Sequence, residues 1–172
     1  MKALGLLFSF LITIPLSCKD NGGTHGPTAQ EQQLTANFKN FIEIAWNEKS
    51  MDTLKSTIAN NYTCNHNGIR IANNQSEMQA FMTLYFTGFP DAKIITETIT
   101  IKDRQLFTQW TFTGTNTGTF SEIPATGKKI KINGYATILF NNQGKIAQED
   151  IYYNELEFLQ QLGYTLNQPI LE

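Results

Sequence analysis

The sequence predicts a single α+β domain in which three helices near the N-terminus are followed by an antiparallel sheet. In the first half of the chain, apolar residues recur at helical spacing. The second half consists of segments rich in Thr, Ile and aromatic residues, and these segments alternate in polarity. The chain has 172 residues, of which 41% are hydrophobic, and this is enough for one domain to bury its own core.

Three helices are predicted from apolar residues that share one face. The first begins at Gln30 and a shorter one spans about 51–58. The third ends at Gly88 and Pro90, and Asn74 or Ser76 can cap its start. The apolar faces of the first and third helices carry Leu34, Phe38, Phe41, Ile42, Ala45 and Trp46, and Met78, Phe81, Met82, Tyr85, Phe86 and Phe89. Between the second and third helices, residues 62–67 are predicted to be extended or looped.

Four strands are predicted in the second half of the chain. They span about 92–102, 106–116, 129–140 and 145–153, and turn residues separate them. A final short helix over 155–162 ends at Gly163.

The charge and motif content argues against several classes of partner. The formal net charge is -2, and no basic patch marks a nucleic-acid surface. No histidines and carboxylates stand at metal-ligand spacing, and no dinucleotide, phosphate-loop or nucleophile-elbow motif occurs. The sequence therefore predicts no nucleic acid, no metal and no cofactor.

The first residues resemble a bacterial lipoprotein signal. A positive start is followed by an apolar run at 3–16 that is too short to span a bilayer comfortably, and then by Leu16-Ser17-Cys18. We expect residues 1–17 to be removed as a signal peptide, Cys18 to carry lipid, and 18–29 to form a flexible tether. The protein would then be exported and anchored to a bacterial membrane, on its periplasmic face or at the cell surface. The alternative is ordinary secretion, with Cys18 lost or spare.

Several ordered segments carry a family resemblance. A Gly-Thr-x-x-Gly-x-Phe segment begins at Gly114, and Pro-x-Thr-Gly-Lys begins at Pro124. Phe89-Pro90-Asp91 precedes them, and Gly144-Lys145-Ile146 and Gln161-Leu162-Gly163 follow. This set resembles the SnoaL-like polyketide cyclase and ester cyclase family. The resemblance implies a domain over 30–166, before a tail at 167–172. It also implies the cone-shaped fold of nuclear transport factor 2, in which a curved antiparallel sheet encloses a pocket.

The resemblance also indicates where acid and base groups are expected. Catalytic members close a ring by aldol chemistry, without metal or cofactor, using a carboxylate near the end of the last strand. Here that position is Asn154, and the family's histidine after the Gly-Thr pair falls at Asn116. An amide does not titrate, so classical cyclase activity is not expected from these two positions.

Alternation along the last strand separates two sets of side chains. Gln148, Asp150, Tyr152 and Asn154 share one side, and Ala147, Glu149, Ile151 and Tyr153 share the other. We assign the first set to the pocket and expect Asp150 to be a candidate acid/base group whose pKa is raised by burial. The alternative is that Asp150 is a structural hydrogen-bond partner. His66 is a second candidate, although a lone histidine is more often structural.

Two functional readings follow. In the first, a lipid-anchored domain binds a small, largely apolar or aromatic molecule without turning it over. The expected ligand-binding residues are Trp46, Trp110, Phe112, Asn116, Gln148, Tyr152 and Asn154. In the second, the domain is a cofactor-independent cyclase, isomerase or hydratase that uses Asp150 and His66. A homodimer through the outer face of the sheet is also expected, and Thr111, Thr113 and Glu149 are assigned to that face.

Overall fold

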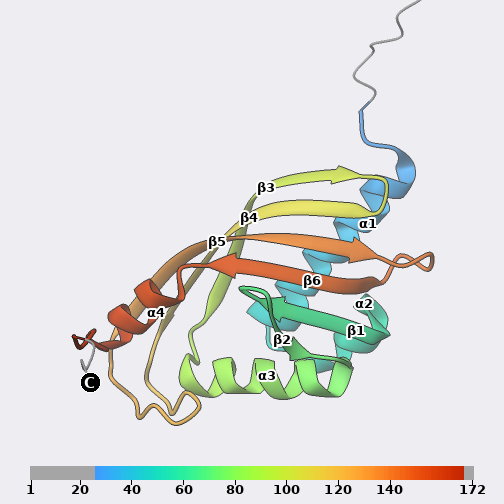
Figure 1. Ribbon diagram of the computed structural model, residues 1–172. Helices are drawn as coiled ribbons and strands as arrows, with labels where there is room; N and C mark the ends of the chain where they lie inside the picture. The colour runs from blue at the N-terminus through green and yellow to red at the C-terminus, as the bar shows by residue number, and fades with distance from the viewer. Residues whose placement is uncertain (1–25, 169–172) are drawn as a thin grey trace, which may run out of the picture.

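The structure is a computed structural model that describes residues 26–168. Its helical elements are α1 (Ala29–Asn40), the π-helical segment η1 (Phe41–Asn47), the 3₁₀ turn η2 (Met51–Thr53), α2 (Leu54–Thr57), α3 (Gln75–Gly88) and α4 (Glu155–Leu162). Its strands are β1 (Ile58–His66), β2 (Ile69–Ala72), β3 (Lys93–Lys102), β4 (Gln105–Thr115), β5 (Lys129–Phe140) and β6 (Ile146–Tyr153). Figure 1 shows these elements arranged as a curved sheet with helices on one side.

The strands form one sheet in the order β2-β1-β6-β5-β4-β3. All neighbouring pairs are antiparallel except β1 and β6, which run parallel. The predicted antiparallel sheet is therefore corrected to a mixed one. The difference arises from β1, whose Asn60, Asn61 and Asn65 are poor strand formers and conceal a strand in the sequence. β1 turns into β2 at Asn67 and Gly68, both with positive φ, as an Asn-Gly hairpin turn favours.

Local signals explain where the helices begin. Thr28 and Glu31 form a capping box, in which the Thr28 hydroxyl accepts from the Glu31 N–H and the Glu31 carboxylate accepts from the Thr28 N–H. Asn74 caps α3 by accepting from the Glu77 N–H. The first predicted helix does not continue as one α-helix, because it widens into the π-helical segment η1 at Phe41. Phe41, Ile42, Ala45 and Trp46 are nevertheless buried, as the spacing predicted.

The core lies between the helices and the inner face of the sheet. Phe38 of α1, Trp46 of η1 and Met82 of α3 are buried in one cluster with Leu106 and Ile138 of the sheet. A second cluster near α4 contains Phe89, Phe112, Ile130, Phe158 and Leu162. The expected α+β fold is confirmed, since the helices pack on a curved sheet that does not close into a barrel.

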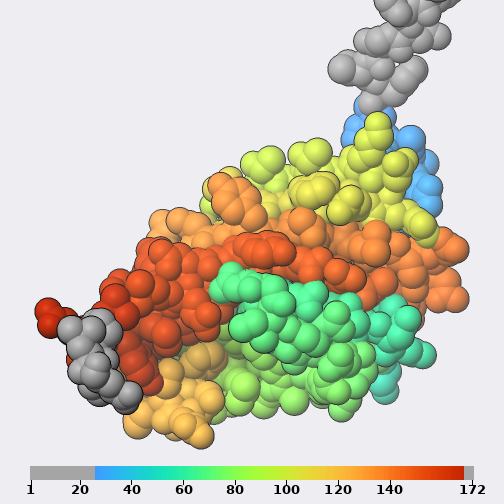
Figure 2. Space-filling view, in the orientation of Figure 1, coloured from blue at the N-terminus to red at the C-terminus, as the bar shows by residue number. Residues whose placement is uncertain are grey.

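The other face of the sheet is turned toward the viewer in Figure 2, where the strands lie side by side above α3. Five large hydrophobic side chains of β3 to β6 are exposed to solvent: Ile95, Phe107, Tyr135, Leu139 and Tyr152. We call these five residues the outer apolar patch.

The predicted signal peptide and the lipidated Cys18 lie outside the described residues. Within residues 26–168, no helix is long and apolar enough to cross a membrane.

Candidate functional site

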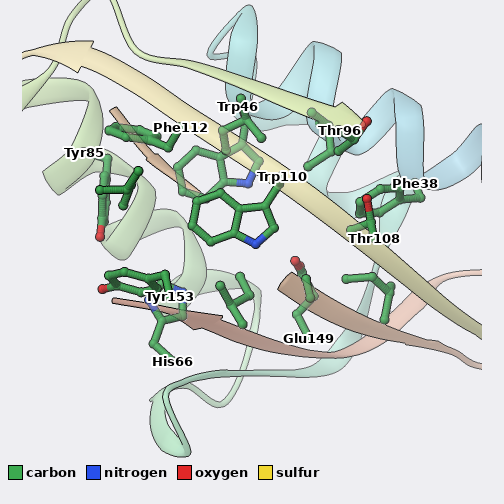
Figure 3. A pocket seen from close by; sticks show the side chains of 16 residues that line it. Phe38, Trp46, His66, Tyr85, Thr96, Thr108, Trp110, Phe112, Glu149 and Tyr153 are labelled. Atoms are coloured by element: carbon green, nitrogen blue, oxygen red, sulfur yellow. The ribbon is translucent and has the colours of Figure 1, made fainter. Parts of the chain in front are cut away.

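A cavity of about 70 Å³ lies between the inner face of the sheet and the helices. Its lining comes from α1, η1 and α3 on one side and from β1 and β3 to β6 on the other (Figure 3). The lining is mostly apolar, with Ile42, Ile94, Ile132, Ile138 and Ile151 among its members. Such a lining, with a few polar groups directed into it, is typical of small-molecule sites.

Glu149 of β6 is the one carboxylate among the residues that line this cavity. Its side chain is only 3% exposed, and its Oε1 accepts a hydrogen bond of 2.5 Å from the hydroxyl of Tyr62 on β1. Desolvation by burial raises the pKa of Glu149 from 4.5 to about 7, and the Tyr62 hydrogen bond opposes that rise. The negative charge of Asp150 adds to the rise. Near pH 7, Glu149 is therefore present in both protonated and ionised forms.

His66, at the end of β1, lines the cavity as a neutral ring. Burial lowers the pKa of His66 from 6.5 to about 4. The ring packs edge-on against Phe81 and Tyr153, with centroids 5.0 Å and 5.7 Å away. Its Nε2 atom is buried and has no hydrogen-bond partner among the described residues. A neutral imidazole here can accept or donate a hydrogen bond but cannot supply a positive charge at neutral pH.

Trp110 of β4 contributes the second buried nitrogen of the lining. Its indole Nε1 likewise has no partner within the described part of the chain. Trp110 faces Gly134 across the β4–β5 pair, and a Cβ atom at position 134 would lie 2.2 Å from the indole Cζ2. The missing side chain at Gly134 therefore makes room for the indole ring.

The structure brings together four of the residues expected at the pocket. Trp46, Trp110, Phe112 and His66 all line the cavity. In Figure 3 the first three surround its upper part, and His66 lies beside Tyr153 below them.

The expected pocket face of β6 is corrected, because its other face lines the cavity. Glu149, Ile151 and Tyr153 are the lining residues, and Gln148, Asp150 and Tyr152 are not. Asp150 instead accepts hydrogen bonds from Asn65 (2.5 Å) and Gln148 (2.7 Å). Tyr152 is 50% exposed. The assignment of Glu149 to the outer face is corrected for the same reason.

A signal for Glu149 was present in the sequence. It is the only charged residue of the alternating set that also contains Ala147, Ile151 and Tyr153. In a sheet covered on one side, the more apolar set faces the core, so an acid within that set is the unusual one.

The sequence of the chain matches a known protein family. The sequence profile described as SnoaL-like polyketide cyclase matches residues 23–162, which is most of the chain. The chain belongs to this family. No curated protein sequence gives a match.

Solved structures similar to this SnoaL-like domain share its fold. A protein from Jannaschia sp. CCS1, assigned to the SnoaL-like polyketide cyclases, is 15% identical with a TM-score of 0.75, over 83% of this chain and 99% of that one. AclR from Streptomyces galilaeus, assigned as a hydroxylase, is 18% identical with a TM-score of 0.68, over 80% and 85%. TsrD from Streptomyces laurentii is 22% identical with a TM-score of 0.66, over 81% and 98%. At these identities the likeness shows the fold alone.

In this SnoaL-like chain the two amides at expected acid/base positions make structural hydrogen bonds. Asn116 is buried, donates to the carbonyl oxygens of Gly88 (3.1 Å) and Gly118 (2.9 Å), and accepts from the Thr126 N–H (2.8 Å). Asn154 is the N-cap of α4 and accepts from the Glu157 N–H. Neither lines the cavity. Among the residues described, no three His, Cys, Asp or Glu side chains form a group that could hold a metal ion.

Proposed function

We propose that this SnoaL-like domain is a cofactor-independent acid/base enzyme of the cyclase or isomerase type. It binds a small, largely apolar molecule in the cavity, and Glu149 exchanges a proton with that molecule. The observation that carries the proposal is a buried carboxyl on the cavity wall whose pKa is raised to about 7. A general acid or base is most effective when its pKa lies near the working pH.

The proton transfer that Glu149 can perform is simple. The ionised carboxylate takes a proton from a carbon next to a carbonyl, and the electron pair of that C–H bond passes into the carbonyl group to give an enolate. The protonated carboxyl then returns the proton to the same or another position. Glu149 therefore takes the role that the sequence suggested for Asp150, which has amide partners away from the cavity.

Binding without turnover is the second candidate. It is favoured by the hydrogen bond between Tyr62 and Glu149, which would also serve as a purely structural link between β1 and β6. The amides at Asn116 and Asn154 also favour binding without turnover, because neither can transfer a proton.

An exchange experiment separates the two candidates. Cyclopentanone is a small carbonyl probe, and the loss of its α-hydrogens in D₂O can be followed by proton NMR. Acid/base assistance is worth about 10²–10⁴-fold, so Glu149→Gln should abolish most of the acceleration given by the wild type. Asp150→Asn is the matched control, since it makes the same chemical change one residue along on the other face. Equal exchange rates for the wild type and Glu149→Gln would favour binding without turnover.

We also propose that the mature protein is anchored to a bacterial membrane through lipid on Cys18. The support is the run at 3–16 followed by Leu16-Ser17-Cys18. Cys18→Ser should release the protein from the membrane fraction. Wild-type protein that is already soluble, with residue 17 still attached, would contradict this proposal.

A homodimer through the outer apolar patch is proposed as well. Tyr135 and Tyr152 face each other across β5 and β6, and both are exposed. Exposed apolar groups that gather on one face are typical of interaction surfaces. Light scattering should give a dimer for the wild type and a monomer for Tyr135→Glu. A wild type that stays monomeric at high concentration would remove the proposal.

A further inference from the structure

The cavity contains two buried ring nitrogens without protein partners. They are Nε2 of His66 and Nε1 of Trp110, both residues line the same space, and the absence of a partner holds for residues 26–168. Buried polar groups in folded proteins are nearly always hydrogen-bonded, so each exception calls for an explanation. Oxygen atoms of the lining, such as those of Thr96, Thr108 and Glu149, form no hydrogen bond with either nitrogen. A small molecule that occupies the cavity can supply the missing partner.

The chemistry of Trp110 narrows the identity of that partner. An indole N–H only donates, so its partner must be an acceptor, and an oxygen atom is the natural one. The lining holds no Lys or Arg, and its one carboxyl, Glu149, becomes negative as the pH passes about 7. An anionic ligand would be repelled by that carboxylate without a cation to offset it. A neutral oxygen is therefore favoured over a carboxylate or phosphate.

The position of the Trp110 donor is fixed by Gly134. A Cβ atom at position 134 would lie 2.2 Å from Cζ2 and 2.6 Å from Cε2 of the indole, and 2.5 Å from the Tyr152 carbonyl oxygen. No real side chain fits these distances, so the indole lies against bare backbone. Gly134 in this way sets the place of the donor.

We infer that Trp110 is the residue that anchors the ligand, donating its indole N–H to a neutral carbonyl oxygen, and that Gly134 is its positioning residue. The inference rests on the proposed function, and it adds the donor and the size of the ligand. The cavity of about 70 Å³ limits the ligand to a small molecule. His66 lines the same cavity, and its neutral imidazole can donate a hydrogen bond to the ligand or accept one from it.

The test uses the two tryptophans of the chain, Trp46 and Trp110. In ¹⁵N-labelled protein each gives one indole N–H signal, and Trp46→Phe and Trp110→Phe assign them. The probes are cyclopentanone and methylenecyclopentane, which have the same shape and differ only in an oxygen replaced by a CH₂ group. Cyclopentanone should move the Trp110 signal as a new hydrogen bond would, and methylenecyclopentane should not.

Affinity gives the second readout. Trp110→Phe should weaken cyclopentanone binding about tenfold and leave methylenecyclopentane binding almost unchanged, because only the ketone loses a hydrogen bond. Equal binding of the two probes to the wild type would overturn the inference, and so would a ketone that leaves the Trp110 signal in place. The signal shift is measured on the wild type, and either tryptophan variant alone is enough to assign the two signals.

Glu149→Gln separates this inference from the proposed function. If both hold, the variant binds cyclopentanone through Trp110 as the wild type does but no longer exchanges its α-hydrogens. A Trp110 signal that responds in both proteins, without any exchange in either, would remove the acid/base function and leave the anchor intact. Exchange that depends on Glu149 but not on Trp110 would overturn the anchor and leave the function.

Discussion

Glu149 and Asp150 are consecutive residues of β6, and their carboxyl groups lie on opposite faces of the sheet. Glu149 lines the cavity and accepts from Tyr62, whereas Asp150 accepts from Asn65 and Gln148. Burial in the apolar cavity raises the pKa of Glu149 to about 7.

Glu149→Gln should change the pH dependence of stability. The folded state keeps a proton on Glu149 up to about pH 7, whereas the unfolded chain loses it near 4.5, so the wild type loses stability as the pH rises between these values. The glutamine variant lacks this loss and should be more stable than the wild type at pH 8, by up to roughly 3 kcal/mol. Chemical denaturation at pH 4 to 8 measures the difference, and Asp150→Asn serves as control. A constant difference across this range would contradict the buried carboxyl.

His66→Gln should show the opposite pH dependence. Burial holds the pKa of His66 at about 4, and the unfolded chain takes up its proton near 6.5, so the wild type loses stability as the pH falls from 6.5 to 4. The variant lacks this loss. Its free energy of unfolding relative to that of the wild type should therefore rise as the pH falls from 6.5 to 4. In the wild type the effects of His66 and Glu149 oppose each other between 4.5 and 6.5. Parallel pH profiles for His66→Gln and the wild type would argue against a neutral buried imidazole.

Tyr62→Phe removes the hydroxyl that donates to Glu149. Because that hydrogen bond lowers the pKa of Glu149, its loss should move the pKa above the wild-type value of about 7. The free energy of unfolding should fall by about 1–3 kcal/mol, since a buried acceptor is left without a donor. Tyr152→Phe removes an exposed hydroxyl and is the matched control. Losses of equal size in the two variants would show that the Tyr62 bond has no special role.

Gly134→Ala places a methyl group where Trp110 and the Tyr152 carbonyl already lie. Overpacking of this kind costs about 1–3 kcal/mol, and the indole must move into the cavity to relieve it. Gly26→Ala is the control, because nothing lies within 4 Å of a Cβ at that position. Thermal unfolding and the Trp110 indole signal should both change for the first variant alone. An unchanged indole signal in a folded Gly134→Ala protein would show that Gly134 does not position the ring.

Much of the fold could be predicted because its elements have strong periodic signals. The apolar stripe with Asn74 before it and Gly88 after it gave α3, and alternation over 129–140 gave β5 with the bounds that the structure has. β1 is predicted only as an extended or looped segment over 62–67, since several asparagines occupy its exposed positions and its parallel pairing with β6 is a long-range contact. The π-helical widening at Phe41 has no signal in the spacing of the apolar residues.

Only part of the candidate site could be predicted, because local sequence patterns do not determine how strands face and pair. Alternation separates two sets of residues in β6 but does not say which set faces the helices, and the set that contains Asp150 does not line the cavity. The pairing of Trp110 with Gly134 depends on the register of β4 and β5, which no local pattern determines. The unpartnered nitrogens of His66 and Trp110 become visible only when all neighbours are in place.

The pKa of Glu149 tests the central claim most directly. Protein labelled with ¹³C at the glutamate carboxyl can be titrated by NMR, and Glu149→Gln identifies the signal. Desolvation in the cavity predicts a midpoint of about 7 for Glu149. A midpoint near the ordinary value of 4.5 would contradict the account, because Glu149 would then be a solvated carboxylate with no proton to exchange at neutral pH.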